Sequence, residues 1–182
     1  MALTKVRGSG LGTLGDGTAN DVKILFDGNA QDYHIGLDDS TDSLTIGKGS
    51  ALGTTAHIIS DADGHVTMPL QPMYRALLTN RMSLSGSAET QVTDITENID
   101  IGGNASGGTF TCPIAGRYLA TFSGSYRSDG ASYVDASIKQ NTSYAARAYS
   151  ELPNAAQVRA ANCWHPFGMS GLMNCSANDT IK

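Results

Sequence analysis

The stretch GGTFTCPIAGRYLATF, residues 107–122, decides the fold class of this chain. Phe110 lies between two threonines, a composition that favours an extended strand. Pro113 and Gly116 then frame a tight corner, because proline fixes φ and glycine tolerates positive φ. Beyond the corner, Tyr118 and every second residue after it point to one side, and the residues between them point to the other. We therefore predict a strand, a sharp turn and a second strand, forming a central hairpin whose aromatic side chains enter a core.

Composition narrows the class of protein. The 182 residues include 21 glycines without the triplet period of collagen, so many tight turns are expected. Charged residues make up 16%, spread along a chain of net charge −5 with no basic run, which argues against both intrinsic disorder and nucleic-acid binding. No stretch approaches the roughly 18 apolar residues of a membrane span, so no membrane insertion is expected. Residues 1–7 lack the apolar segment of a signal peptide, so classical secretion is not indicated.

The three cysteines, Cys112, Cys163 and Cys175, have wide and irregular spacing. This spacing favours small buried apolar side chains over a disulfide framework. A Cys163–Cys175 bridge remains an open alternative.

The chain divides into three parts. Residues 1–20 are rich in glycine and form a docking leader; without a following Gly-Lys-Ser/Thr or helix they do not match a phosphate loop. Residues 21–69 alternate apolar and polar side chains in short strands, with an Asp-Gly turn at residues 61–64. Each expected hairpin carries few apolar residues per face, and such hairpins are marginal alone. These strands must therefore bury their faces against other chains, which a three-fold arrangement would allow.

The run from Phe26 through residues 32–39 to residues 59–64 resembles the shaft segments of bacteriophage tail-fibre proteins. The resemblance implies an intertwined homotrimeric β shaft followed by a head. On this basis the residues expected at the trimer interface or in the core of the shaft are Phe26, Tyr33, Ile35 and Ile59.

Residues 70–182 resemble the complement-type globular head, a trimeric jelly roll related to the tumour-necrosis-factor fold. The resemblance follows the opening strand at Tyr74, the stretch 107–122, the turn at Asn141 and the segment 172–181, where Asn178 replaces the usual glycine. It implies a jelly-roll β-sandwich, with core or trimer-facing positions at Tyr74, Phe110, Tyr118 and Phe122.

This head departs from the family in two places. The family continues past the element at Asp179-Thr180, so we expect that the natural chain is longer or that a neighbouring chain completes the sheet. Residues 143–161 are rich in alanine, which favours helix by local propensity. Pro153 interrupts this segment, and we predict β-structure there.

Neither a metal nor a cofactor is expected. The four histidines contain no His-x-His pair, and the Asp-rich turns do not complete a calcium loop, although an ion on a trimer axis remains open. No nucleophile elbow, His-Glu-x-x-His or phosphate-binding motif is present, so we predict a protein that is not an enzyme. The alternative is a glycan-degrading spike with paired carboxylates at a trimer seam.

A receptor surface is the remaining candidate site. Tyrosine and arginine are enriched in recognition sites because they combine area, planarity and hydrogen bonding. The candidates lie in or near expected loops; the alternative for each is a place in the trimer interface or on ordinary surface: Tyr126, Arg127, Asp129, Tyr144, Arg147 and Tyr149.

The sequence thus predicts an all-β homotrimeric virion fibre, assembled in the host bacterial cytoplasm. The expected parts are a leader (residues 1–20) that docks on other virion proteins, a shaft (residues 21–69) and a jelly-roll head (residues 70–182). The head would attach to a host surface glycan or protein by multivalent binding. One alternative is a capsid head fibre or decoration protein. Another is a non-viral soluble ligand-binding jelly-roll protein, which would carry a secretion signal and a collagen stalk.

Overall fold

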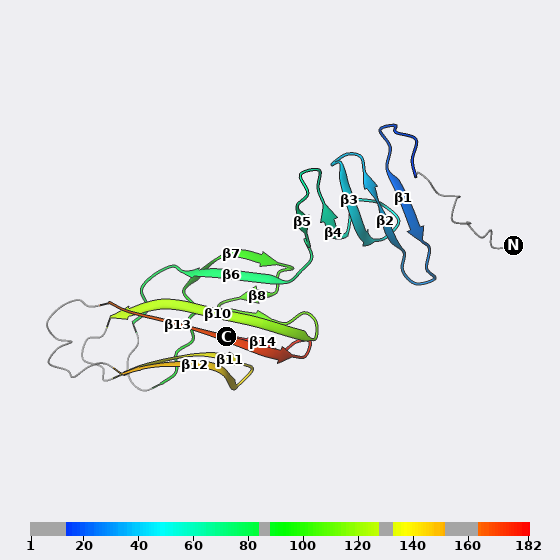
Figure 1. The fold of residues 1–182 in the computed structure, drawn as a ribbon. Helices are drawn as coiled ribbons and strands as arrows, with labels where there is room; N and C mark the ends of the chain where they lie inside the picture. The colour runs from blue at the N-terminus through cyan, green and yellow to red at the C-terminus, as the bar shows by residue number, and fades with distance from the viewer. Residues whose placement is uncertain (1–13, 84–87, 128–132, 152–163) are drawn as a thin grey trace. The chain divides into compact units, whose positions relative to one another are not determined.

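The computed structural model describes residues 14–83, 88–127, 133–151 and 164–182. Strands are the regular structure throughout these residues, and no helix occurs among them, so the all-β prediction is confirmed (Figure 1). The chain divides into two compact units, Met1–Gln71 and Pro72–Lys182.

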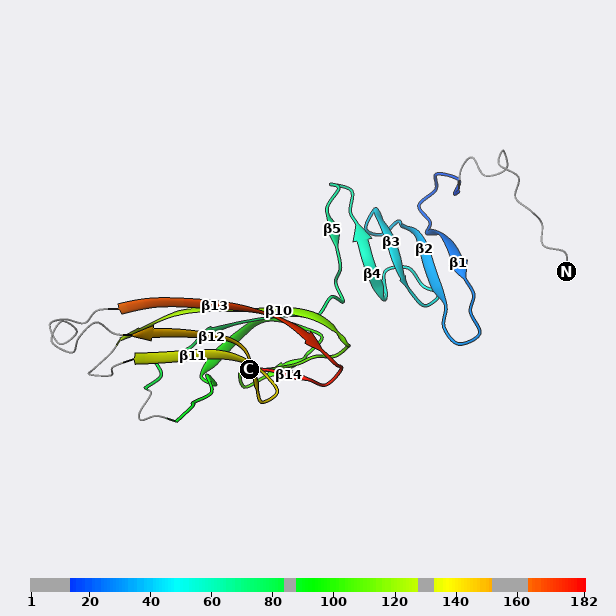
Figure 2. The ribbon, with the colours of Figure 1, turned by 60° about the horizontal axis from the view of Figure 1, so that its bottom comes forward.

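The first unit is one antiparallel sheet whose strands follow chain order (Figures 1 and 2). Each strand pairs with its chain neighbour, so this pairing is satisfied within a single copy. The hairpin expected at residues 61–64 is present: Asp61 Oδ1 accepts hydrogen bonds from the backbone N–H groups of Asp63 and His65. The strands are β1 (Val22–Phe26), β2 (Tyr33–Asp38), β3 (Ser43–Lys48), β4 (Ala56–Ser60) and β5 (Val66–Thr67).

One face of this sheet is covered by residues 49–55, which we call the strap. His34 Nδ1 lies 2.9 Å from the carbonyl oxygen of Gly49, and Lys23 Nζ donates to the carbonyl oxygen of Ser50. His34 and Thr45 are fully buried. A Cβ atom at Gly47 would lie 2.6 Å from the Thr55 carbonyl oxygen, so only glycine allows this close approach. The buried side chains of β2 and β3 on this covered face are therefore polar.

The opposite face is apolar and open within this chain. Ile24, Ile35 and Ile46 lie opposite one another on three adjacent strands. Six large side chains on this face are 39–59% exposed, and we call them the apolar ladder: Ile24, Phe26, Tyr33, Leu37, Leu44 and Ile46.

The described residues of the second unit form three sheets (Figures 1 and 2). β6 (Met73–Leu78) pairs with β7 (Ile95–Ile101), and β10 (Gly116–Arg127) pairs with β13 (Trp164–Cys175). The third sheet has the order β12-β11-β14-β9-β8. Its strands are β8 (Ala105–Ser106), β9 (Thr109–Thr111), β11 (Tyr133–Gln140), β12 (Ser143–Glu151) and β14 (Thr180–Ile181).

The core of the second unit is apolar and centred on five buried residues: Phe110, Cys112, Ile138, Met173 and Cys175. The alternation expected in β10 is present, since Tyr118, Ala120 and Phe122 pack against this core while Leu119 is exposed. The aromatic rings are in contact, with the Phe110 and Tyr118 centroids 5.8 Å apart.

The expected central hairpin is wrong, because β9 and β10 do not pair with each other. β9 pairs with β8 and β14, whereas β10 pairs with β13. The cause lies at the corner: the Cys112 backbone N–H donates to the Asp179 carbonyl, the Cys112 carbonyl accepts from Asn178, and Pro113 has no N–H to offer. The corner carries the chain from one sheet to another.

The alanine-rich segment is a strand where the structure describes it. β12 covers Ser143–Glu151, and residues 152–161 lie outside the described residues. Ala146 packs against the core opposite Ile138, so tertiary packing overrides the helical propensity of alanine.

A polar clamp joins the turn at Asn141 to the segment before β14. Asp179 Oδ1 accepts a hydrogen bond from Asn141 Nδ2, and Oδ2 accepts from Gln140 and from the Ser176 backbone. Asn141 and Asn178 have φ of 54° and 71°, in the left-handed region that asparagine tolerates better than most residues. Asparagine is therefore a suitable residue at both positions.

Candidate receptor-binding surface

A β-bulge brings the candidate residues Tyr144 and Arg147 to the same face. Residues three apart on a regular strand point to opposite sides. Lys139 pairs with Tyr144 and Ile138 with Ala146, so Ala145 is the extra residue of a bulge. After the bulge, Arg147 lies on the side of Tyr144, above the outward positions of β11.

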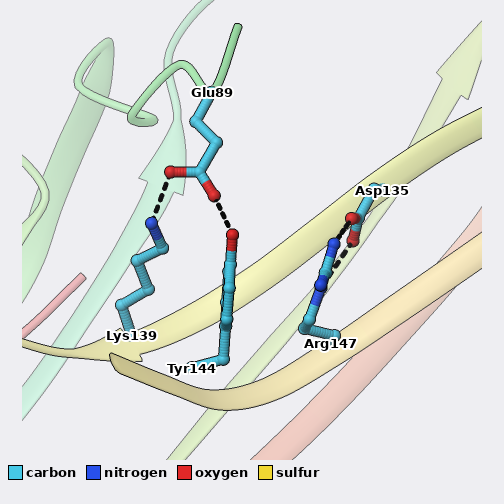
Figure 3. Close-up of polar contacts among 5 residues, drawn as sticks. All are labelled: Glu89, Asp135, Lys139, Tyr144 and Arg147. Atoms are coloured by element: carbon cyan, nitrogen blue, oxygen red, sulfur yellow. Dashed lines mark hydrogen bonds and ion pairs between the residues drawn. The ribbon is translucent and has the colours of Figure 1, made fainter. Parts of the chain in front are cut away.

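Five side chains form one connected polar network on this face (Figure 3). Glu89 accepts hydrogen bonds from Lys139 Nζ with one carboxylate oxygen and from the Tyr144 hydroxyl with the other. Arg147 pairs with both oxygens of Asp135, with 3.4 Å from Nε to Oδ1. The network therefore connects β11, β12 and the segment at Glu89.

The Tyr144 ring links the two halves of this network. Lys139 Nζ lies 4.7 Å from the ring centroid and Arg147 Cζ lies 4.4 Å from it. Figure 3 shows the ring standing between the two cations. A ligand would therefore meet the edge of the network and its hydrogen-bonding groups rather than a bare aromatic face.

These contacts shift the pKa values of the groups. The hydrogen bond from Lys139 lowers the pKa of Glu89, and that bond raises the pKa of Lys139 in return. The bond to Glu89 raises the pKa of Tyr144, because ionisation would remove its proton from that bond. Pairing with Asp135 raises the pKa of Arg147. These directions favour the usual protonation state at neutral pH for four of the groups: Glu89, Lys139, Tyr144 and Arg147.

The charges of the network balance. Two carboxylates face two cations, so the site offers donors and acceptors without a net charge. A polyanion would find no excess positive charge here, whereas a neutral ligand with many hydroxyl groups would find both kinds of hydrogen-bonding partner. The chemistry fits a neutral glycan better than a sulfated or phosphorylated ligand.

Of the other four receptor candidates, the structure describes the side chain of Tyr126 alone. The Tyr126 ring packs against Phe167, with centroids 5.9 Å apart. Arg127 ends β10 and Tyr149 lies in β12, but their side chains are outside the described part, as is Asp129 entirely. The structure thus brings together Tyr144 and Arg147.

Sequence reasoning missed Glu89, Asp135 and Lys139. A signal was available for two of them, because the alternation of β11 places Asp135 and Lys139 on its polar side. Glu89 had none, since it is 50 residues from Lys139 in the chain.

The structure also places each expected core or trimer residue. Phe26 and Tyr33 belong to the apolar ladder, and Ile35 lies on the same face. Ile59 lies opposite Thr45, on the covered face, and its neighbour Ile58 lies opposite Ile46 instead. In the second unit Phe110 is buried, and the other three pack against the core: Tyr74, Tyr118 and Phe122.

Cys112 and Cys175 are free thiols that lie together in the core. Burial, and then a hydrogen bond with Cys175, raise the pKa of Cys112 to about 12. Cys163 lies outside the described residues, so its bridge with Cys175 is not addressed by the structure.

The described residues hold neither a metal cluster nor a membrane-spanning helix. No three His, Cys, Asp or Glu side chains among them come together as a metal site. No helix in that part of the chain is long and apolar enough to cross a membrane. In comparisons with known proteins, no family model, no curated protein and no solved structure matches this chain.

Proposed function

We propose that this chain is a homotrimeric virion fibre protein that docks through residues 1–20 and attaches to a host surface ligand through its second unit. The observation that carries the proposal is the interior of the first unit. Among its described residues, Leu52 is the one large apolar side chain that is buried, while most large apolar residues of its strands are exposed. A sheet of this kind reaches stability when other chains cover it, as in a fibre built from several copies.

The second unit supports the attachment role. It has its own apolar core and holds a balanced polar network on the outer side of β11 and β12. We propose that this network contacts a neutral host glycan, and that a jelly-roll arrangement presents one such site per copy. Three weak sites per fibre raise avidity by roughly 10²–10⁴ without any new contact.

Antibodies against the second unit test the proposal. They should label particles of a virus that carries this chain and should block adsorption to its host. Labelling on the capsid instead of the tail would favour the head-fibre alternative. Particles without label would overturn the proposal.

The network has its own test. Arg147→Ala should abolish binding of the purified chain to host cells while leaving its unfolding temperature nearly unchanged, because exposed ion pairs contribute little to stability. Ser123→Ala, on the outer side of β10 rather than β11 or β12, is the control and should bind normally. If both variants bind equally well, the network is not the receptor-binding site.

A further inference from the structure

We propose that the apolar ladder is the surface through which copies of this chain associate, by packing side chains face to face rather than by exchanging strands. The inference rests on the proposed function, because it names the surface that holds the fibre together. The six residues of the ladder were defined above by their exposure and their common face.

Backbone pairing argues for packing over exchange. β2, β3 and β4 each have hydrogen-bonded strands on both sides within one chain. An intertwined arrangement would break these pairs and gain equivalent ones, so it offers no new backbone hydrogen bonds in the middle of the sheet. What the single chain leaves unsatisfied is the burial of side chains.

The covered face cannot serve as the core of this sheet. Beneath the strap lie His34, Asp38, Ser43 and Thr45, all buried and polar. A β-sheet is stable in water when it packs an apolar face against another layer. The apolar face of this sheet is the ladder, and the strap lies on the other side.

The ladder has the extent and chemistry that fit another copy of itself. Six side chains exposed by 39–59% present roughly 500 Å² of apolar surface, if a large side chain has about 150–250 Å². Two ladders packed face to face would together remove about 1,000 Å² from water, which is the lower limit expected of a specific interface. A single ladder already equals the largest patches found on monomers, about 300–600 Å².

Charge also favours a second copy over a charged partner. Among the paired positions of this face in β1 to β4, Lys48 at one end is the charged residue. Isoleucines occupy the same row on adjacent strands, so identical faces meet apolar against apolar. An acidic or basic partner would find no matching charges across the ladder.

A matched pair of substitutions in the full chain tests the inference. Ile46 is 39% exposed on the ladder, and Leu25 is 40% exposed on the opposite face. Ile46→Lys should raise the concentration at which half the chains are associated by at least about tenfold, because it places a charge in an apolar contact. Leu25→Lys should leave that concentration unchanged. Sedimentation velocity across a dilution series gives both values, and circular dichroism confirms that each variant is folded.

A second arm reports on the ladder directly, even where the second unit also associates. With oxidised glutathione, which is reduced as the new disulfide forms, Ile46→Cys should give inter-chain disulfides on a non-reducing gel and Leu25→Cys should not. Equal cross-linking of the two variants, or none by Ile46→Cys, would overturn the inference. So would a wild-type chain that stays monomeric, which would leave the ladder for a different protein.

The two proposals fail separately. If association depends on Ile46 but the antibodies label no virion, the proposed function alone is overturned. If the antibodies label virions but association does not depend on Ile46, the inference about the ladder alone is overturned. A dimer held by the ladder would keep this inference and remove the three-fold symmetry from the proposed function.

Discussion

The two units of this chain differ in where their large apolar side chains lie. The second unit buries them, and the first unit leaves them exposed to water. The second unit buries Phe110, Ile138 and Met173 in a core of its own. The first unit buries His34 and Thr45 and exposes Phe26 and Ile24. The same alternation of apolar and polar residues thus gives a unit with its own apolar core in one case and a sheet with an uncovered apolar face in the other. What differs is whether a second layer lies within the same chain.

The strongest test of this contrast compares two phenylalanines. Phe110 is 7% exposed and Phe26 is 59% exposed. Phe110→Ala should lower the free energy of unfolding of the second unit by about 3–5 kcal/mol, because it leaves a cavity in a packed core. Phe26→Ala should leave the dissociated chain unchanged and weaken only its association. Denaturant titrations at low and high protein concentration separate the effect on unfolding from the effect on association. If Phe26→Ala lowered the free energy of unfolding of the dilute chain as much as Phe110→Ala does, the contrast between the two units would be contradicted.

A pair of glycines probes the covered face of the first unit. A Cβ at Gly47 would lie 2.6 Å from the Thr55 carbonyl and 2.7 Å from His34 Nε2, so Gly47→Ala must displace the strap. We expect a loss of about 1–3 kcal/mol from overpacking. Gly168→Ala in β13 is the control, since its nearest atom is 3.5 Å away. Thermal unfolding of both variants checks this, and equal stability would show that the strap is loosely held.

The reactivity of the Cys112 thiol measures how well the core of the second unit excludes water. Its pKa of about 12 means that the folded protein disfavours the thiolate. Native Cys112 should react with iodoacetamide at pH 8 on the order of 10³-fold more slowly than an ordinary thiol with pKa near 8.5. The same shift stabilises the fold below pH 8.5, and this contribution is lost as the pH rises towards 12. Peptide mass spectrometry after timed alkylation gives the rate; fast labelling would contradict a dry core.

The smallest effect is expected at the polar clamp, which closes one end of the second unit. Hydrogen bonds, first from Asn141, lower the pKa of Asp179. Its stabilisation is therefore complete above the pKa of the unfolded chain and is lost as the pH falls through the lower folded value. Asp179→Asn should lower the unfolding temperature at pH 7 by a few degrees and by less at pH 3. Melting curves across this range check the trend, and a loss equal at both pH values would contradict it.

The sequence predicted some features of the fold and not others. Local signals sufficed for the all-β class, the turn at residues 61–64 and the alternation of Tyr118 and Phe122. The pairing of β10 with β13 was not predictable, because it joins residues that are 37 to 59 positions apart along the chain. Alanines in β12 favoured helix locally, and their packing against Ile138 decided otherwise.

The candidate site was predictable in part for the same reason. Tyr144 and Arg147 could be named from residue type, but their shared face depends on a bulge that no residue signals. Glu89 comes from a distant segment, so only folding brings it to Lys139. In the first unit, Asp-Gly turns fixed the strands, yet which face the strap would cover depends on the glycine at position 47.

The outer surface of β12 is sensitive to changes in the length of the strand and tolerant of amino-acid substitutions, and the bulge at Ala145 shows why. Side-chain direction along a strand follows the parity of the residue count, and the extra residue sets the parity of everything after it. Deleting Ala145 would only remove the bulge, because Tyr144 and Arg147 would then be two positions apart and still share a face. A single residue inserted between Ala146 and Arg147 would instead turn Arg147 inward. Exchanging Tyr144 or Arg147 for other residues leaves the parity intact. Variation in this part of the chain should therefore accumulate as substitutions, while changes in length are confined to the bulge and to positions beyond the strand ends.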